Sequence, residues 1–124
     1  MKLPFLDLNY QFLEYESQIR GRIDRVLQHG QYIMGPEVAE LEQQLRKYTG
    51  TKHCITVSSG TEALMISLMA AGVGPGDEVI TSPFTFVSSA EVIALVGATP
   101  VFVDIEAETY NLDATKLKTS ITDK

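Results

Sequence analysis

The stretch Ser58-Ser59-Gly60-Thr61-Glu62-Ala63-Leu64 decides how the surrounding chain folds. It follows the β-favouring run 54–57 and opens a segment of good helix formers, 63–71, which together predict a strand, a tight turn and a helix. Ser59 and Glu62 have the spacing of a capping box, in which the hydroxyl accepts the Glu62 amide and the carboxylate returns to the Ser59 amide. The first-turn amides of such a helix attract an anion, above all a phosphate, and Gly60 lets it approach the backbone. The turn is a candidate phosphate site, and the same residue types also occur where they only satisfy backbone groups.

Two amphipathic helices are predicted before this turn. From Tyr10 to Gln28 apolar residues recur on one face, and Gly30 follows the end of the pattern. Pro36 suits the first position of a second helix, because its missing amide hydrogen would be unpaired there. Apolar residues at helical spacing then continue to a stop at Gly50.

Two further strands and a helix are predicted after the turn. The run 78–81 predicts a short strand, 88–96 an alanine-rich helix that ends at Gly97, and 100–105 a third strand that is apolar on both faces. Strand, helix, strand, helix, strand is the pattern of an α/β domain. A weak helix is expected at 114–118.

Three parallel strands make a small sheet, since parallel sheets normally have more strands and both faces covered. We therefore interpret residues 1–124 as a single incomplete domain, either truncated or completed by another chain. Residues 1–50 form its N-terminal helical segment, and residues 51–124 form a βαβαβ portion.

Composition excludes several classes of function. The net charge of −6 and ten scattered basic residues argue against a nucleic-acid surface. Cys54, the single cysteine, cannot form an internal disulfide and is expected to be buried in the first strand. His29 and His53 lie in no ligand-spaced set, so we expect no metal site. No stretch approaches the length of a membrane helix and residues 1–7 lack the apolar segment of a signal peptide, which predicts a cytoplasmic protein.

Five ordered motifs carry a resemblance to a known family. They are Gly30-Gln31-Tyr32-Ile33-Met34-Gly35-Pro36-Glu37-Val38, Ser59-Gly60-Thr61-Glu62-Ala63-Leu64, Gly74-Pro75-Gly76-Asp77-Glu78-Val79-Ile80, Phe84-Thr85-Phe86-Val87 and Pro100-Val101-Phe102-Val103-Asp104. In this order they resemble the DegT/DnrJ/EryC1/StrS aminotransferases, which are pyridoxal-phosphate (PLP) enzymes that act on nucleotide-linked keto sugars. The resemblance spans essentially the whole chain. It implies the N-terminal part of the PLP-transferase large domain, of the aspartate aminotransferase-like fold type I, preceded by two helices.

The resemblance also implies site residues. Gly60 and Thr61 would hold the cofactor phosphate through backbone amides, with the Thr61 hydroxyl adding a bond, and Phe86 would stack on the pyridine ring. Ordinary core packing is the alternative for Phe86. Glu62 is interpreted as a cap, and the loop 31–36 as either structural or directed at substrate or a partner subunit.

By the resemblance, the residues that carry out the family's reaction are not expected among residues 1–124. The family's Schiff-base lysine and its acid for the pyridinium nitrogen are expected beyond residue 124, and none of the lysines present has the family's lysine context. No catalytic residue is therefore assigned, and the chain alone is predicted to be inactive and to bind PLP weakly or not at all. By resemblance the parent enzyme is a homodimer that transfers an amino group from an amino acid to a nucleotide sugar, in polysaccharide or antibiotic-sugar biosynthesis. A PLP-dependent deoxysugar dehydratase of the same fold and a non-catalytic phosphate-binding or interaction module stay open.

Overall fold

The structure is a computed structural model that describes residues 5–124. By its internal contacts the chain divides into two compact units, Met1–Thr56 and Val57–Lys124. The interpretation of residues 1–4 as part of an N-terminus without a signal peptide lies outside the described residues. The assignment of both units to one incomplete domain stays a prediction.

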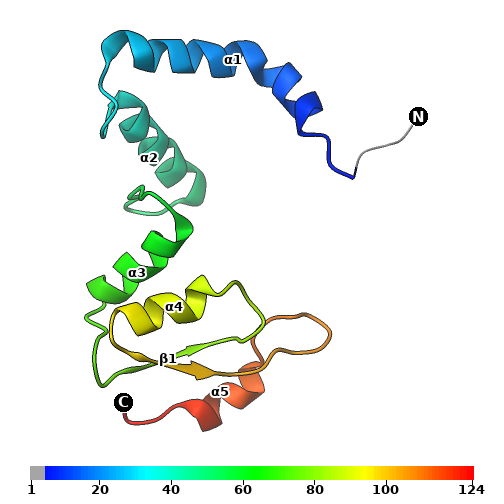
Figure 1. The fold of residues 1–124 in the computed structure, drawn as a ribbon, viewed down its shortest axis with the longest axis vertical. Helices are drawn as coiled ribbons and strands as arrows, with labels where there is room; N and C mark the ends of the chain where they lie inside the picture. The colour runs from blue at the N-terminus through cyan, green and yellow to red at the C-terminus, as the bar shows by residue number, and fades with distance from the viewer. Residues whose placement is uncertain (1–4) are drawn as a thin grey trace. The chain divides into compact units, whose positions relative to one another are not determined.

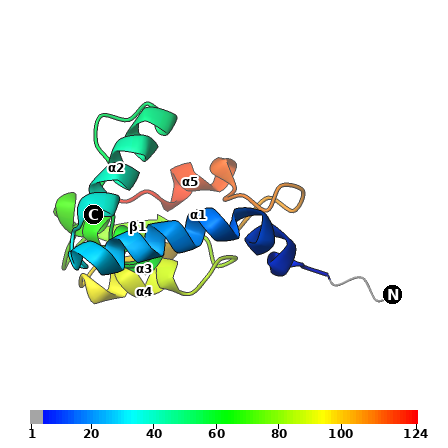
Figure 2. The ribbon, with the colours of Figure 1, turned by 90° about the horizontal axis from the view of Figure 1, so that it is seen from above.

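The first unit contains two helices, α1 (Leu8–His29) and α2 (Pro36–Thr49) (Figures 1 and 2). α1 begins two residues before the predicted start, because the Asp7 side chain accepts hydrogen bonds from the amides of Asn9 and Tyr10. Both helices end at a glycine in the left-handed conformation, Gly30 and Gly50, as the sequence predicted. Within the described part of the unit neither helix buries a residue.

Polar side chains join the two helices of the first unit. Arg22 of α1 forms a two-pronged pair with Glu40 of α2, and the longer of its two contacts is 3.1 Å. His29 Nε2 lies 3.0 Å from a Glu37 carboxylate oxygen, while the Gln31 amide donates to His29 Nδ1. These contacts tie the end of α1 to the start of α2.

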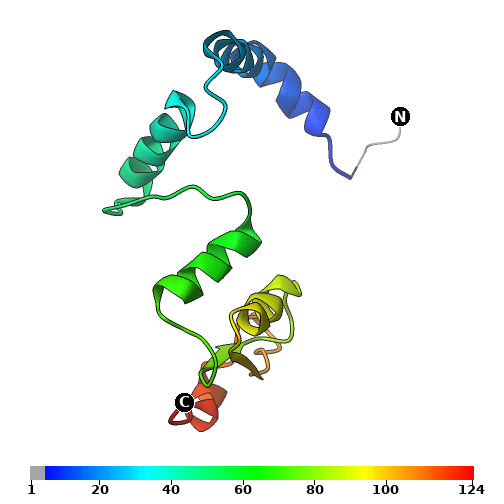
Figure 3. The same cartoon turned by 60° about the vertical axis from the view of Figure 1, so that its left-hand side comes forward.

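The second unit contains a parallel βαβ segment. β1 (Glu78–Thr81) and β2 (Thr99–Phe102) pair with Glu78 opposite Thr99, and α4 (Ser88–Leu95) connects them (Figure 1). α3 (Gly60–Ala70) packs on α4, and α5 (Ala114–Ser120) follows the loop after β2 (Figures 1 and 3). The sequence prediction for β1 is confirmed at both ends.

The apolar core of the described residues lies around α4. Val92 and Ile93 are 2% exposed, and Ala98 and Val103 beside β2 are also buried. Gly97, at the turn between α4 and β2, has a φ of 85°, a conformation that side-chain-bearing residues rarely adopt. The chain can therefore reverse within the three residues 96–98, so that β2 packs against α4.

Two strand predictions were wrong in part. The predicted strand 54–57 pairs with no other strand among residues 5–124, since the Thr56 amide donates to the Glu42 carboxylate instead of to a neighbouring strand. Cys54 is half-buried and not buried as expected. β2 ends at Phe102 rather than 105, because Ile105 turns away into an isolated antiparallel bridge with Leu112.

Candidate functional site

The start of α3 is built as the capping residues predicted. Ser59 is extended at the N-cap, and its Oγ accepts the Glu62 amide at 3.1 Å. The Ala63 amide donates to the Ser59 carbonyl at 3.0 Å, which closes the first turn. The predicted return bond from the Ser59 amide to the Glu62 carboxylate does not form within the described residues. Only one of the two hydrogen bonds of the capping box is therefore present.

Gly60 and Thr61 occupy the first two positions of α3. Their amides precede the hydrogen-bonded turns of the helix, and no acceptor for either occurs among residues 5–124. A Cβ placed on Gly60 would meet nothing within 4 Å, so the backbone is uncovered on the side where a side chain would stand. Two free amides at the positive end of an 11-residue helix can bind an anion, and the uncovered backbone allows close approach.

Phe86 lies in the loop between β1 and α4. Its side chain is 74% exposed, which removes ordinary core packing within this chain as an explanation. The Phe86 carbonyl accepts the Ser89 amide at 3.2 Å, so the residue sits directly at the start of α4. An exposed ring at the carboxyl end of a parallel strand is placed where ligands of α/β sheets bind.

The structure places all three predicted site residues in the second unit. α3 and α4 pack on each other and run in the same general direction in Figures 1 and 3, so the starts of both helices lie at one side of this unit. Gly60 and Thr61 mark one of these helix starts and Phe86 precedes the other. The loop 31–36 belongs to the first unit.

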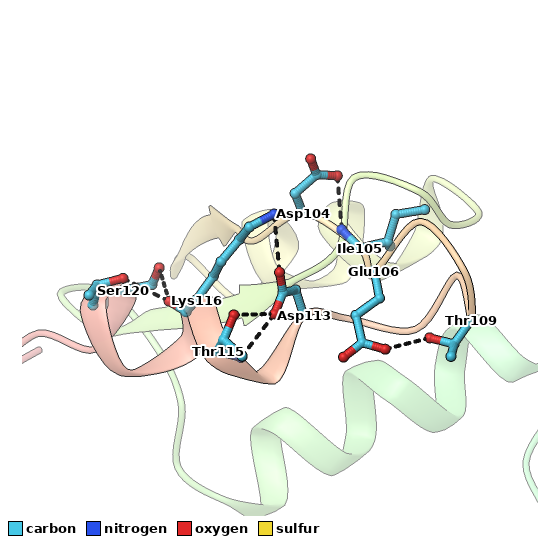
Figure 4. Close-up of polar contacts among 9 residues, drawn as sticks. Asp104, Ile105, Glu106, Thr109, Asp113, Thr115, Lys116 and Ser120 are labelled. Carbon is cyan, nitrogen blue, oxygen red and sulfur yellow. Dashed lines mark hydrogen bonds and ion pairs between the residues drawn. The ribbon is translucent and has the colours of Figure 1, made fainter.

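The loop after β2 holds residues that sequence reasoning did not assign. Asp113 caps α5 by accepting the Thr115 hydroxyl at 2.6 Å and the Thr115 amide at 2.9 Å, and Lys116 lies 3.2 Å away (Figure 4). These bonds, led by the Thr115 hydroxyl, hold the pKa of Asp113 below its ordinary value. The pattern Asp113 followed by Thr115 is an N-cap signal that could have found this turn.

Tyr110 in the same loop was missed for a different reason. Its ring stacks on Phe84 of the β1–α4 loop, with ring centroids 5.6 Å apart and an angle of 30° between the planes. Because this contact joins two loops that are distant in sequence, no local pattern could have predicted it.

Two classes of site have no support among the described residues. No group of three His, Cys, Asp or Glu side chains within residues 5–124 is arranged to hold a metal ion. In the same range, every helix is too short or too polar to span a bilayer.

Comparison with protein families identifies a match over most of the chain. Residues 14–124 match the model of the DegT/DnrJ/EryC1/StrS aminotransferase family. A curated relative from Pseudomonas aeruginosa, UDP-2-acetamido-2-deoxy-3-oxo-D-glucuronate aminotransferase, is 54% identical over 120 residues. That alignment covers 97% of this chain and 33% of the relative, so the chain spans about a third of the length of this relative.

Solved structures show the same fold. A DegT/DnrJ/EryC1/StrS aminotransferase from Brucella abortus superposes with a TM-score of 0.91 at 44% identity, over 94% of this chain and 31% of that one. NtdA from Bacillus subtilis, solved with bound cofactor PMP, superposes with a TM-score of 0.91 at 33% identity, over 98% and 28%. The fold is therefore that of an N-terminal part of fold type I aminotransferases, and the fold expectation is confirmed.

Proposed function

The chain belongs to the DegT/DnrJ/EryC1/StrS aminotransferase family, and on that premise we propose that it forms the N-terminal part of a PLP-dependent enzyme that aminates a nucleotide-linked keto sugar. The amino group would come from an amino acid. The observation that carries the proposal is the start of α3, where the Gly60 and Thr61 amides have no acceptor among the described residues and the Cβ side of Gly60 is open. The P. aeruginosa relative, named for a UDP-linked oxo sugar, supports a nucleotide sugar as the substrate class.

The residues present fit the phosphate and ring of PLP. The Gly60 and Thr61 amides would hold the phosphate, and the Thr61 hydroxyl, which bonds to no described residue, would donate a further hydrogen bond. Phe86 would lie against the pyridine ring, and offset stacking of this kind adds about 0.5–1.5 kcal/mol and fixes the ring plane. Bound there, PLP supplies an electron sink through which amino groups are exchanged.

The part played by this chain is binding and orientation. Backbone amides fix the phosphate without a charged side chain, which agrees with the acidic net charge of −6. The exposed Phe86 ring would cover one face of the cofactor and exclude water from it. We assign no proton-transfer residue among these 124 residues, and we propose that the chain alone is inactive.

We also propose a homodimeric, cytoplasmic parent enzyme. Large apolar side chains of α1 are at least one-third exposed, among them Phe12, Leu13, Ile19, Ile23 and Leu27. Apolar surface of this kind is typical of a protein that associates. Analytical ultracentrifugation of the chain would show a monomer–dimer equilibrium, and a monomer at every concentration would contradict the dimer.

The phosphate site can be tested with the chain itself. Amide chemical shifts are followed by NMR while PLP, or pyridoxal without its phosphate, is added. We expect PLP to shift the Gly60 and Thr61 amides, with pyridoxal leaving them nearly unchanged, because the phosphate is the group they bind. The Glu37 amide in the first turn of α2, which begins at Pro36, is the matched control for non-specific binding to helix starts.

Two variants sharpen this test. Gly60→Ala adds a methyl group to open space, so it should preserve the fold while blocking close approach of the phosphate. Thr61→Val removes the hydroxyl and keeps the shape of the side chain. The proposal is contradicted if both variants bind PLP like the unmodified chain.

The gene sequence distinguishes an aminotransferase from a dehydratase. The sequence downstream of codon 124 is read for the residue in the family's Schiff-base position. A lysine there supports the aminotransferase, whereas a histidine overturns it in favour of the dehydratase.

A further inference from the structure

Two loops leave the carboxyl ends of the paired strands and are joined by an aromatic contact. The first, residues 82–87, carries Phe84 and Phe86, and the second, residues 103–113, carries Tyr110. The Phe84 and Tyr110 rings are stacked at 5.6 Å. Both rings are more than half exposed, at 63% and 61%, so the contact is not part of the core around α4.

The backbone around Tyr110 is shaped for this contact. Tyr110 has a φ of 58°, which is uncommon for a residue with a bulky side chain and therefore strained. Its amide donates to the Glu106 carbonyl at 2.9 Å, and the Glu106 amide donates to the Asn111 carbonyl at 2.9 Å. The Thr109 hydroxyl closes the turn onto the Glu106 carboxylate (Figure 4).

The loop that carries Phe86 is anchored at its end by α4, because the Val87 carbonyl accepts the amides of Ala90 and Glu91. The Phe84 amide donates to the Ser82 hydroxyl at 3.1 Å, and the Phe86 carbonyl accepts the Ser89 amide at the start of α4. Between these two points, among the described residues, the contact to another loop is the Phe84 ring on Tyr110. A stacked aromatic pair fixes both distance and ring plane, which backbone bonds within one loop cannot do.

We propose that Tyr110 is a positioning residue, whose ring braces Phe84 and thereby orders the loop that presents Phe86. The hydrogen bonds between Glu106 and residues 110–111 hold the strained backbone at Tyr110 in place. The role of this Tyr110–Phe84 contact in cofactor binding rests on the proposed function, in which Phe86 stacks on the PLP ring. The ordering itself is a property of the chain and can be measured without any ligand.

The test compares backbone order in three variants of the 124-residue chain. NMR order parameters of residues 84–87 are measured in the unmodified chain, in Tyr110→Leu and in Tyr110→Phe. We expect values near the rigid level of about 0.85 to fall below about 0.6 in Tyr110→Leu, and to recover in Tyr110→Phe, which keeps the ring. Tyr48→Leu, which removes an 88% exposed tyrosine from α2, is the matched control and should change nothing in this loop.

A second variant covers the case in which Tyr110→Leu disturbs its own loop. Phe84→Leu removes the other ring of the pair and leaves the hydrogen bonds of residues 104–113 in place. Residues 85–87 should lose order in this variant while the amides of 104–113 stay unchanged. Unchanged order at 85–87 in both leucine variants would overturn the proposal.

The effect of the Tyr110–Phe84 contact on cofactor binding is measured separately, as the dissociation constant for PLP in an NMR titration. Loss of the brace should weaken binding by roughly threefold to tenfold in Tyr110→Leu, with recovery in Tyr110→Phe. If order is lost and the PLP dissociation constant does not change, Tyr110 is structural and its role toward the cofactor is wrong. If PLP added in large excess shifts no amide at Gly60, the proposed phosphate site fails, and the order parameters still decide whether the brace exists.

Discussion

The two helices of the first unit expose their apolar side chains, whereas the βαβ segment of the second unit has a small buried apolar core around α4. α1 and α2 bury none of their residues, but Val92 and Ile93 of α4 are each 2% exposed. The helices of the first unit depend on caps, glycine stops and polar pairs, which act locally. Burial of apolar surface, the larger stabilising contribution, is concentrated in the second unit.

The largest expected effect tests this difference directly. Ile93→Ala removes methyl groups from the core around α4 and should lower the free energy of unfolding by about 3 kcal/mol. Ile19→Ala, at a position of α1 that is 41% exposed, is the matched control and should cost less than about 1 kcal/mol. Urea unfolding followed by circular dichroism measures both, and equal losses would remove the distinction between the units.

Two glycine substitutions should act in opposite directions. In Gly97→Ala the new Cβ would lie 2.9 Å from Pro75 Cγ at a φ of 85°, so we expect a loss of about 1–2 kcal/mol. In Gly21→Ala the Cβ meets nothing within 4 Å in the interior of α1, and better helix propensity should stabilise by about 0.5–1 kcal/mol. Thermal melts of the two variants should shift in opposite directions; a stabilised Gly97→Ala would contradict the role of this turn.

Cap removal should have the same effect in both units, because capping is local. Asp7→Ala at the start of α1 and Ser59→Ala at the start of α3 each delete an acceptor of first-turn amides and should cost about 1 kcal/mol. Hydrogen exchange of the first-turn amides in each helix reports the fraying. Asp7→Asn and Ser59→Thr keep an acceptor oxygen and serve as controls. A much larger loss at Ser59 than at Asp7 would show that this turn is coupled to packing.

The sequence predicted the elements whose signals are local. The limits of β1 and the glycine stops of α1 and α2 follow from turn residues and helix periodicity close to those positions. The Ser59 cap was predicted from spacing alone, and the bond to the Glu62 amide confirmed it.

Two of the failures involve a partner that is distant in sequence. Residues 54–57 favour a strand by composition, yet the Thr56 amide bonds to Glu42, 14 residues earlier. Tyr110 meets Phe84 across two loops, and nothing in the sequence around either residue signals it. For the candidate site, the sequence predicted the open helix start at Gly60 and left the roles of Thr61 and Phe86 to the family resemblance.

The smallest expected effect concerns a single carboxylate of the first unit. Glu42 accepts the Thr56 amide and the Thr56 hydroxyl, both at 2.9 Å, and these bonds, led by the amide, lower the pKa of Glu42. Because the pKa is lower in the folded chain than in the unfolded chain, the contribution to stability is complete above about pH 5. It is lost as the pH falls through the lowered pKa of Glu42 in the folded chain.

An NMR titration of the Thr56 amide measures this loss. We expect its chemical shift to move as Glu42 is protonated, whereas the amides of Val79 and Val101 in the β1–β2 pair should not follow the same curve. Glu42→Gln keeps an acceptor oxygen but cannot titrate, so the movement should disappear in that variant. A Thr56 shift that titrates equally in Glu42→Gln would mean that another group controls this contact. If the strand amides titrated together with Thr56, the contact would not be local to the first unit, and the contrast between the two units would be weaker than their burial indicates.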